Sequence, residues 1–176
     1  LLPNPLHLKD MQKAINRTYE SIKNKQLIGI FGDYDVDGAT STALLARYFS
    51  KINQKIKTYI PDRFKEGYGP NKNSFKLLIK SGAKIIFTVD CGTSSFEPIK
   101  YAQQQKIDVI VLDHHQSDII LPNACAIVNP NRYDDLSKLK YLCAAGVCFI
   151  FLVGLNKKLR DEKWFSKQNI QEPDML

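Results

Sequence analysis

The sequence lacks the features that mark membrane proteins, secreted disulfide-bonded domains and structural zinc sites. Its longest apolar run, from Leu142 to Leu155, has about 14 residues, whereas a membrane-spanning helix needs about 18 or more. The amino-terminal residues show no basic segment followed by a long apolar stretch, which is the pattern of a secretory signal peptide. The 4 cysteines form no CxxC pair or other zinc-ligand spacing. These absences predict a cytoplasmic protein with no membrane segment and no disulfide framework.

The chain is long enough for one hydrophobic core and too short for two ordinary domains. It has 176 residues, of which 44% are hydrophobic, so we expect residues 1–176 to form a single domain. The chain begins with Leu1 rather than methionine, and residues 171–176 form no recognisable terminal element. These two features predict that the domain is a piece of a longer protein.

The chain carries an excess of positive charge, with a formal net charge of +7 and a pI near 9.2. Such an excess favours an anionic partner such as nucleic acid, because lysine and arginine that neutralise phosphates release condensed counterions. A lysine-rich solvated surface is the alternative explanation. Charge alone leaves both open.

Helical and strand periods of apolar residues alternate along the chain. The predicted helices span 8–25, 38–52, 73–80, 95–105 and 140–162, and the predicted strands span 27–31, 57–60, 84–89, 107–112 and 124–128. Strands separated by helices of this length call for right-handed crossovers. The pattern therefore predicts an α/β fold with a mostly parallel sheet flanked by helices on both faces.

Three of the predicted strands end in acidic residues. The residues that follow them are Asp33, Asp35 and Asp37 after the first, Asp90 after the second, and Asp113, His114 and His115 after the third. Because ligands of parallel sheets bind at the carboxyl ends of the strands, these side chains are expected to share one place. So much negative charge is unfavourable unless cations neutralise it. An Asp after a strand is often a helix N-cap or turn residue, and a histidine pair can be a satisfied polar turn, but their joint occurrence indicates a metal site.

The ligand types favour Mn²⁺, then Mg²⁺, as the metal. Carboxylate oxygens suit hard cations, imidazole nitrogens suit transition metals, and thiolates are missing from the predicted cluster. This number of ligands is compatible with two ions that share one bridging carboxylate, an arrangement that activates water for phosphoryl displacement. We expect Asp90 to be that bridge.

The segments GDYDVDGATSTALL, TVDCGTSS and VLDHHQS, in this order, resemble the first three motifs of the DHH phosphoesterase superfamily. The segment GDYDVDG resembles the corresponding motif in the RecJ branch of single-strand-specific exonucleases. The segments YIPDRFKEGYGPN, VNPNR and LCAAGVCFIFL resemble that branch as well. The likeness covers nearly the whole chain and implies a DHH phosphoesterase domain.

The resemblance implies distinct roles for the seven predicted site residues. By it, metal-ligand positions fall on Asp35, Asp37, Asp90 and His114, and a phosphate-contacting position falls on His115. Asp33 is expected to be an outer carboxylate, a weak ligand or a proton acceptor. We expect Asp113 to hold the histidine pair through a hydrogen bond, since acids behind a metal site commonly fix imidazole orientation.

Two family elements have no counterpart in this sequence: a fourth motif, which contributes a further aspartate to the metal site, and a second, DHHA1-like domain. The resemblance implies that both follow residue 176, and that two ions bind in the complete protein. We expect the chain alone to fold and bind metal weakly, with little or no nuclease activity.

Three residues are predicted to face the substrate. Arg63 and Tyr68 lie in a glycine-containing loop, 61–70, that can bring a guanidinium and an aromatic ring to a nucleic-acid backbone. An ordinary surface loop with Arg63 paired to Glu66 or Asp62 is the alternative. Arg132 is a further candidate for a phosphate contact.

The resemblance implies a metal-dependent 5′→3′ exonuclease that hydrolyses single-stranded DNA with metal-activated water, in DNA repair and recombination. A single-strand-binding protein or a helicase would be expected partners. One alternative is a phosphoesterase for oligonucleotides, cyclic dinucleotides or pyrophosphate, and another is a non-catalytic nucleic-acid-binding scaffold. The segments DYDVDG and PDRFKEGYG argue against the small-substrate phosphoesterase. The intact acids and histidines argue against the non-catalytic scaffold.

Overall fold

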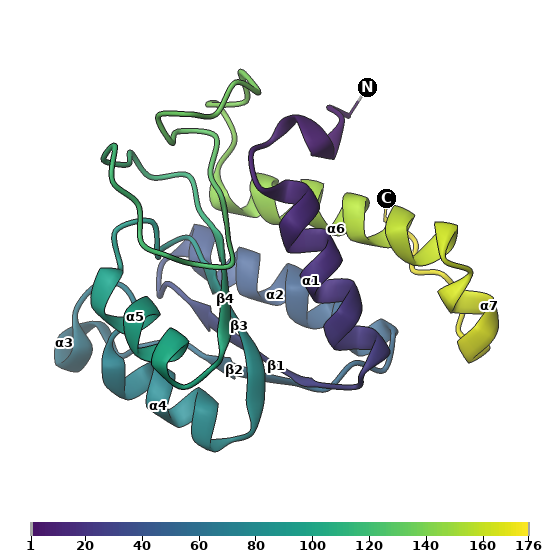
Figure 1. The fold of residues 1–176 in the computed structure, drawn as a ribbon, viewed down its shortest axis with the longest axis horizontal. Helices are drawn as coiled ribbons and strands as arrows, with labels where there is room; N and C mark the ends of the chain where they lie inside the picture. Colours follow the sequence, from purple (N-terminus) through teal and green to yellow (C-terminus); the bar gives the residue numbers. More distant parts are fainter. Residues whose placement is uncertain (1, 176) are drawn as a thin grey trace.

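A five-stranded parallel sheet forms the centre of the computed structural model, which describes residues 2–175 (Figure 1). The strands are β1 (Leu27–Gly32), β2 (Ile56–Tyr59), β3 (Ala83–Val89), β4 (Asp108–Leu112) and β5 (Ala126–Val128). The helices are η1 (Pro5–His7), α1 (Met11–Lys23), α2 (Val36–Lys51), α3 (Arg63–Glu66), α4 (Lys72–Lys80), α5 (Phe96–Gln104), α6 (Ala144–Asp161) and α7 (Trp164–Gln168). The predicted α/β class and parallel sheet are confirmed.

Helices cover both faces of the sheet, as predicted. On one face, α1, α2 and α6 pack through residues such as Ile15, Phe49 and Phe151 against alternate strand residues. On the other face, α4 and α5 pack through Phe75 and Ile99 against the remaining strand residues. Strands buried from both sides consist mainly of apolar residues, which explains the continuous runs in the sequence.

The predicted elements are all present, with ends that differ by a few residues. Helix α1 begins at Met11 rather than near Leu8, because Asp10 has a left-handed backbone with φ of 60° that a helix cannot include. Helix α6 begins at Ala144 rather than near Lys140. The short helices η1, α3 and α7 were not predicted, since one or two turns carry too little periodicity to be recognised.

The strand order β2-β1-β3-β4-β5 places β1 and β3 side by side at the point where the direction of the crossovers reverses. Helix α2 leaves β1 on one face of the sheet, and α5 leaves β3 on the other face. The segments that follow β1 and β3 therefore diverge beyond the strand ends. Open parallel sheets bind ligands in the crevice that forms at such a point. The described residues, 2–175, include no helix that is long and apolar enough to cross a membrane.

Candidate metal centre

A row of buried polar residues lies across the carboxyl edge of four neighbouring strands. The last paired residues of these strands share one register and are Gly32, Val89, Leu112 and Val128. The residues that follow them are Asp33, Asp90, Asp113 and Asn129, which we call the polar row and which are 0–2% exposed. The N–H groups of the three aspartates still donate to carbonyls of the next strand, at 3.0–3.2 Å. Strand pairing therefore sets their spacing.

The loop after β1 and the first turn of α2 bring two further aspartates, Asp35 and Asp37, to this edge. Asp35 is the N-cap of α2, and its Oδ1 accepts the N–H of Gly38 at 2.9 Å, which lowers the pKa of its carboxyl. A side chain at position 38 would put its Cβ 2.5 Å from the carbonyl oxygen of Asp33. Glycine is therefore required for the tight approach that turns the chain from strand to helix at the site.

Asp37 connects the site to α6, a helix distant in sequence. Its Oδ2 and Oδ1 accept the N–H groups of Ala144 and Ala145, each at 2.8 Å. These amides open the first turn of α6, where the helix dipole favours a carboxylate. The N-cap residue of α6, Cys143, makes no side-chain hydrogen bond to the first turn. Asp37 supplies that bond instead, which stabilises the start of α6 at Ala144. Asp37 Oδ2 also lies 3.6 Å from His114 Nε2.

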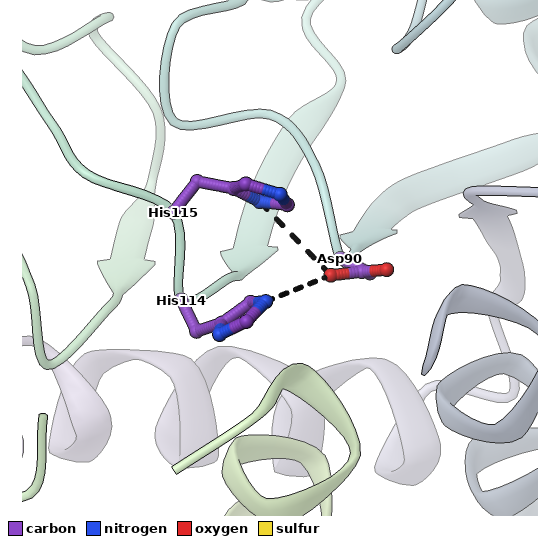
Figure 2. Close-up of side chains that lie close together, drawn as sticks. All are labelled: Asp90, His114 and His115. Carbon is purple, nitrogen blue, oxygen red and sulfur yellow. Dashed lines mark ion pairs between the residues drawn. The ribbon is translucent and has the colours of Figure 1, made fainter. Parts of the chain in front are cut away.

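Asp90 is the most strained and least satisfied residue of the polar row. Its backbone is left-handed, with φ of 61°, and neither carboxylate oxygen has a hydrogen-bond partner among the described residues. Its Oδ1 lies 3.4 Å from His114 Nε2 and 4.0 Å from His115 Nδ1, and both rings turn toward it (Figure 2). Burial, with the neighbouring carboxylates of Asp35 and Asp37, raises the pKa of Asp90 to about 8.

Asp113 is buried like Asp90 but is fully hydrogen-bonded. Its Oδ1 accepts the N–H of His114 at 2.7 Å, the N–H of His115 at 3.2 Å and His115 Nδ1 at 2.8 Å, and its Oδ2 accepts the N–H of Thr93 at 3.1 Å. Burial alone would raise its pKa, but the bonds from His115 and Thr93 outweigh burial and lower it to about 2. An ionised carboxylate only accepts, so His115 carries a proton on Nδ1.

Two groups of side chains in this site could each hold a metal ion, and both include Asp90. One group is Asp33, Asp35 and Asp90, and the other is Asp90, His114 and His115. Within each group the ligand atoms lie within 4.8 Å of one another. Asp33 Oδ1, like both oxygens of Asp90, is buried and has no hydrogen-bond partner within residues 2–175. Buried carboxylate oxygens without donors are costly in a metal-free protein, and a divalent cation would satisfy them.

Tyr68 lies within the site, and Arg63 lies beside the site. The Tyr68 hydroxyl donates to the carbonyl of Asp90 at 3.3 Å and lies 3.3 Å from His115 Nδ1. The guanidinium of Arg63 lies over the ring of Tyr34, 5.4 Å from its centroid. Glu66 instead bonds the Tyr59 hydroxyl at 2.8 Å, so the predicted alternative of an Arg63–Glu66 pair is not the observed arrangement.

Arg132 does not face the metal site in this structure. Its Nη1 donates to Asp10 Oδ2 at 2.7 Å and to the carbonyl of Ile127 at 2.6 Å, while Nε and Nη2 donate to Asp134. The side chain is 9% exposed. Four of the five guanidinium N–H groups are engaged in this way. The phosphate contact of Arg132 stays a prediction.

Three residues at the site had no predicted role: Thr93, Asn129 and Asn131. Their side chains or backbone contact Asp113 and the two histidines. Asn129 directly follows an apolar strand, as the three aspartates of the polar row do. A search for any polar residue at that position, rather than for acids, would have found it.

We expect the metal-free protein to lose stability as the pH rises from about 4 to about 8. Asp90 has a folded-state pKa of about 8, above its ordinary 3.8, so folding favours the protonated form. Its contribution is fully present below the unfolded pKa and disappears as the pH passes the folded pKa. The raised pKa values of Asp33 and His115 act in the same direction. Thermal unfolding in a chelator from pH 4 to 9 measures this, and a melting temperature that rises from pH 5 to 8 would contradict it.

Comparison with known proteins finds a family and several relatives that this chain resembles. A sequence model described as "DHH family, N-terminal domain" matches residues 27–172. The single-stranded-DNA-specific exonuclease RecJ of Bacillus subtilis (strain 168) is 38% identical over 159 residues, which cover 90% of this chain and 20% of that protein.

Two solved structures are similar in fold and sequence. A crystal structure of exonuclease RecJ bound to manganese superposes with a TM-score of 0.78 at 32% identity, covering 86% of this chain and 38% of that one. RecJ in complex with Mn²⁺ from Thermus thermophilus gives a TM-score of 0.72 at 25% identity, covering 94% of this chain and 22% of that one. The chain thus spans well under half of the length of each of these three relatives.

Proposed function

This chain belongs to the DHH family, and from that premise we propose that it contributes the metal-binding half of a hydrolase that degrades single-stranded DNA. The observation that carries the proposal is the Asp90 carboxylate, buried without a donor and shared by two potential metal groups. The relatives named as single-stranded-DNA-specific exonucleases support the substrate class. A 5′→3′ direction, a cytoplasmic location, a role in repair or recombination, and a helicase or single-strand-binding protein as partner are part of the proposal on resemblance only.

We propose that Mn²⁺, or Mg²⁺ in its place, is held by Asp35, Asp37, Asp90 and His114. Hard oxygens with imidazole nitrogen suit these ions, and manganese-bound RecJ structures support the choice. When bound, such ions polarise a phosphodiester and activate water for its hydrolysis.

The residues around the metal positions have complementary tasks in this proposal. Asp113 keeps His115 oriented and favours its protonated form, which raises the pKa of His115. A protonated imidazole beside the ligands can donate to a phosphate oxygen and stabilise the charge that develops there. Tyr68, between Asp90 and His115, limits how far that ring can turn.

The decisive experiment incubates the intact protein with Mn²⁺ and DNA labelled at one end. We expect release of label from 5′-labelled single strands, slower release from 3′-labelled strands, and neither in a chelator. Cleavage of duplex and single strands at equal rates, or from the 3′ end first, would contradict the proposal. Hydrolysis of dinucleotides alone would favour the small-substrate alternative, and DNA binding without hydrolysis would favour the scaffold.

Replacement of Arg63 by alanine is expected to raise KM for single-stranded DNA about 10-fold with little change in kcat. Removal of one charge-assisted phosphate contact costs roughly 1.5 kcal/mol, and Arg63 has no carboxylate partner in the described residues. The matched control is Lys65→Ala on the same helix, where Lys65 lies 3.5 Å from Asp62 and is 82% exposed. Equal effects of the two substitutions would argue against a specific contact by Arg63.

A further inference from the structure

The two site histidines lie on a segment that has no regular secondary structure. Between the end of β4 at Leu112 and the start of β5 at Ala126, the chain forms neither helix nor strand. The connection therefore differs from those after β1, β2 and β3, each of which contains a helix. Metal ligands must be held within a few tenths of an ångström of their positions, so this segment needs another source of order.

Asn129 supplies bonds to this segment from the neighbouring strand. It is the fourth member of the polar row and is 0% exposed. Its Nδ2 donates to the carbonyl of His115 at 2.9 Å and to Thr93 Oγ1 at 3.0 Å, and its Oδ1 accepts the N–H of Asn131 at 2.8 Å. Both amide hydrogens are therefore engaged, and no other neutral side chain of this size offers two donors and an acceptor.

Asn131 extends the same contact by one residue. Its Nδ2 donates to the carbonyl of His114 at 2.5 Å. The N–H groups of His114 and His115 are both accepted by Asp113. The backbone of the two histidines is thus held on its donor side by Asp113, which follows β4, and on its acceptor side by the asparagines after β5.

The turn that carries the two asparagines is itself anchored. The N–H of Arg132 donates to the carbonyl of Asn129 at 3.2 Å, and the Arg132 guanidinium is held by Asp10 and Asp134. Asp10 also accepts the N–H of Ile127 in β5 at 3.3 Å. The start of α1 therefore fixes the turn from behind, and the buried role of Arg132 is explained.

We infer that Asn129, with Asn131, is a positioning residue that holds the backbone of His114 and His115 in the orientation required for metal binding. The inference rests on the proposed function, because that function assigns His114 to the metal and His115 to the phosphate beside it. Neither asparagine needs to touch the metal or the substrate. Substitution of such outer partners typically weakens metal binding about 10- to 100-fold.

The test compares Asn129→Ala with Asn156→Ala in the intact protein. Asn156 is a matched control, since it is 2% exposed and bonds Tyr48 and Glu172 away from the site. Mn²⁺ affinity is measured by titration, and coordination by imidazole nitrogen is measured by pulsed electron paramagnetic resonance. We expect Asn129→Ala to lose about 10- to 100-fold in affinity together with nitrogen coupling, and Asn156→Ala to keep both even if it loses stability.

Two milder substitutions keep the inference testable if Asn129→Ala does not fold. Thr93→Val removes the hydroxyl that Asn129 contacts and that also bonds Asp113, and Asn131→Ala removes the bond to His114. Both are expected to weaken Mn²⁺ binding in the same direction. Unchanged affinity and nitrogen coupling in the folded variants, or an equal loss in Asn156→Ala, would overturn the inference alone. Failure of the wild-type protein to bind Mn²⁺ would contradict the proposed function and the inference with it.

Discussion

Asp90→Asn is expected to abolish metal-dependent hydrolysis while making the metal-free protein more stable. Hydrolysis of single-stranded DNA should fall on the order of 10³-fold, since the substitution removes the carboxylate that both metal groups share. At pH 8 the metal-free variant should gain on the order of 2 kcal/mol, because it no longer buries a charge without a donor. That gain corresponds to a rise in melting temperature of about 5 °C.

The two effects are measured by end-label release with Mn²⁺ and by thermal unfolding in a chelator. Added Mn²⁺ should raise the melting temperature of the wild-type protein but not that of the variant. Asp135→Asn serves as the control, since Asp135 is also buried but bonds Lys9 and Ser137 away from the site. A metal-free variant less stable than the wild-type protein at pH 8 would refute the account of Asp90 as an unsatisfied carboxylate.

Asp113→Asn is expected to have the opposite effect on stability and a smaller effect on activity. Four N–H groups stabilise the ionised Asp113, and its pKa is lowered to about 2 from 3.8. That shift represents about 2 kcal/mol of stability above pH 4, which is lost as the pH falls from 3.8 toward 2. The variant should therefore melt about 5 °C lower at neutral pH. Hydrolysis should fall about 10- to 100-fold as His115 loses its fixed orientation.

Asp108→Asn provides the control for Asp113, because Asp108 begins β4 at the opposite edge of the sheet, and Asp113 directly follows the end of that strand. Asp108 pairs with Arg17 away from the site. It should leave hydrolysis unchanged. The acid limb of unfolding gives an independent check, since the wild-type protein should lose stability between pH 4 and 2 and Asp113→Asn should lose less. Equal acid sensitivity in both proteins would show that Asp113 is not the stabilised carboxylate.

Several features of the site were predictable because they depend on local order in the sequence. The runs that form β1, β3 and β4 are apolar and short, so each strand end could be placed within a residue or two. The aspartates after them then follow directly. The carboxyl ends of parallel strands meet at one edge, and this rule was sufficient to bring Asp33, Asp90 and Asp113 together.

Other features depend on contacts between distant segments and could not be predicted. Asp37 bonds the amides of Ala144 and Ala145, more than 100 positions away, and no local pattern marks that pairing. Arg132 is of a residue type that often contacts phosphate. In the structure it is buried and paired with Asp10, just before the start of α1. A charged side chain has the same sequence signature whether its partner is a substrate or a carboxylate of the same chain.

The sequence by itself determined which residues stand at the strand ends, because hydrophobic runs and the acids that follow them are properties of neighbouring positions. Only the tertiary structure decided how these residues differ. Asp90 and Asp113 are equally buried, but one has no donors and the other has four, and this difference depends on how the loops after β3, β4 and β5 pack. The inclusion of Asn129 in the polar row depends on strand register, which is established only when the sheet forms.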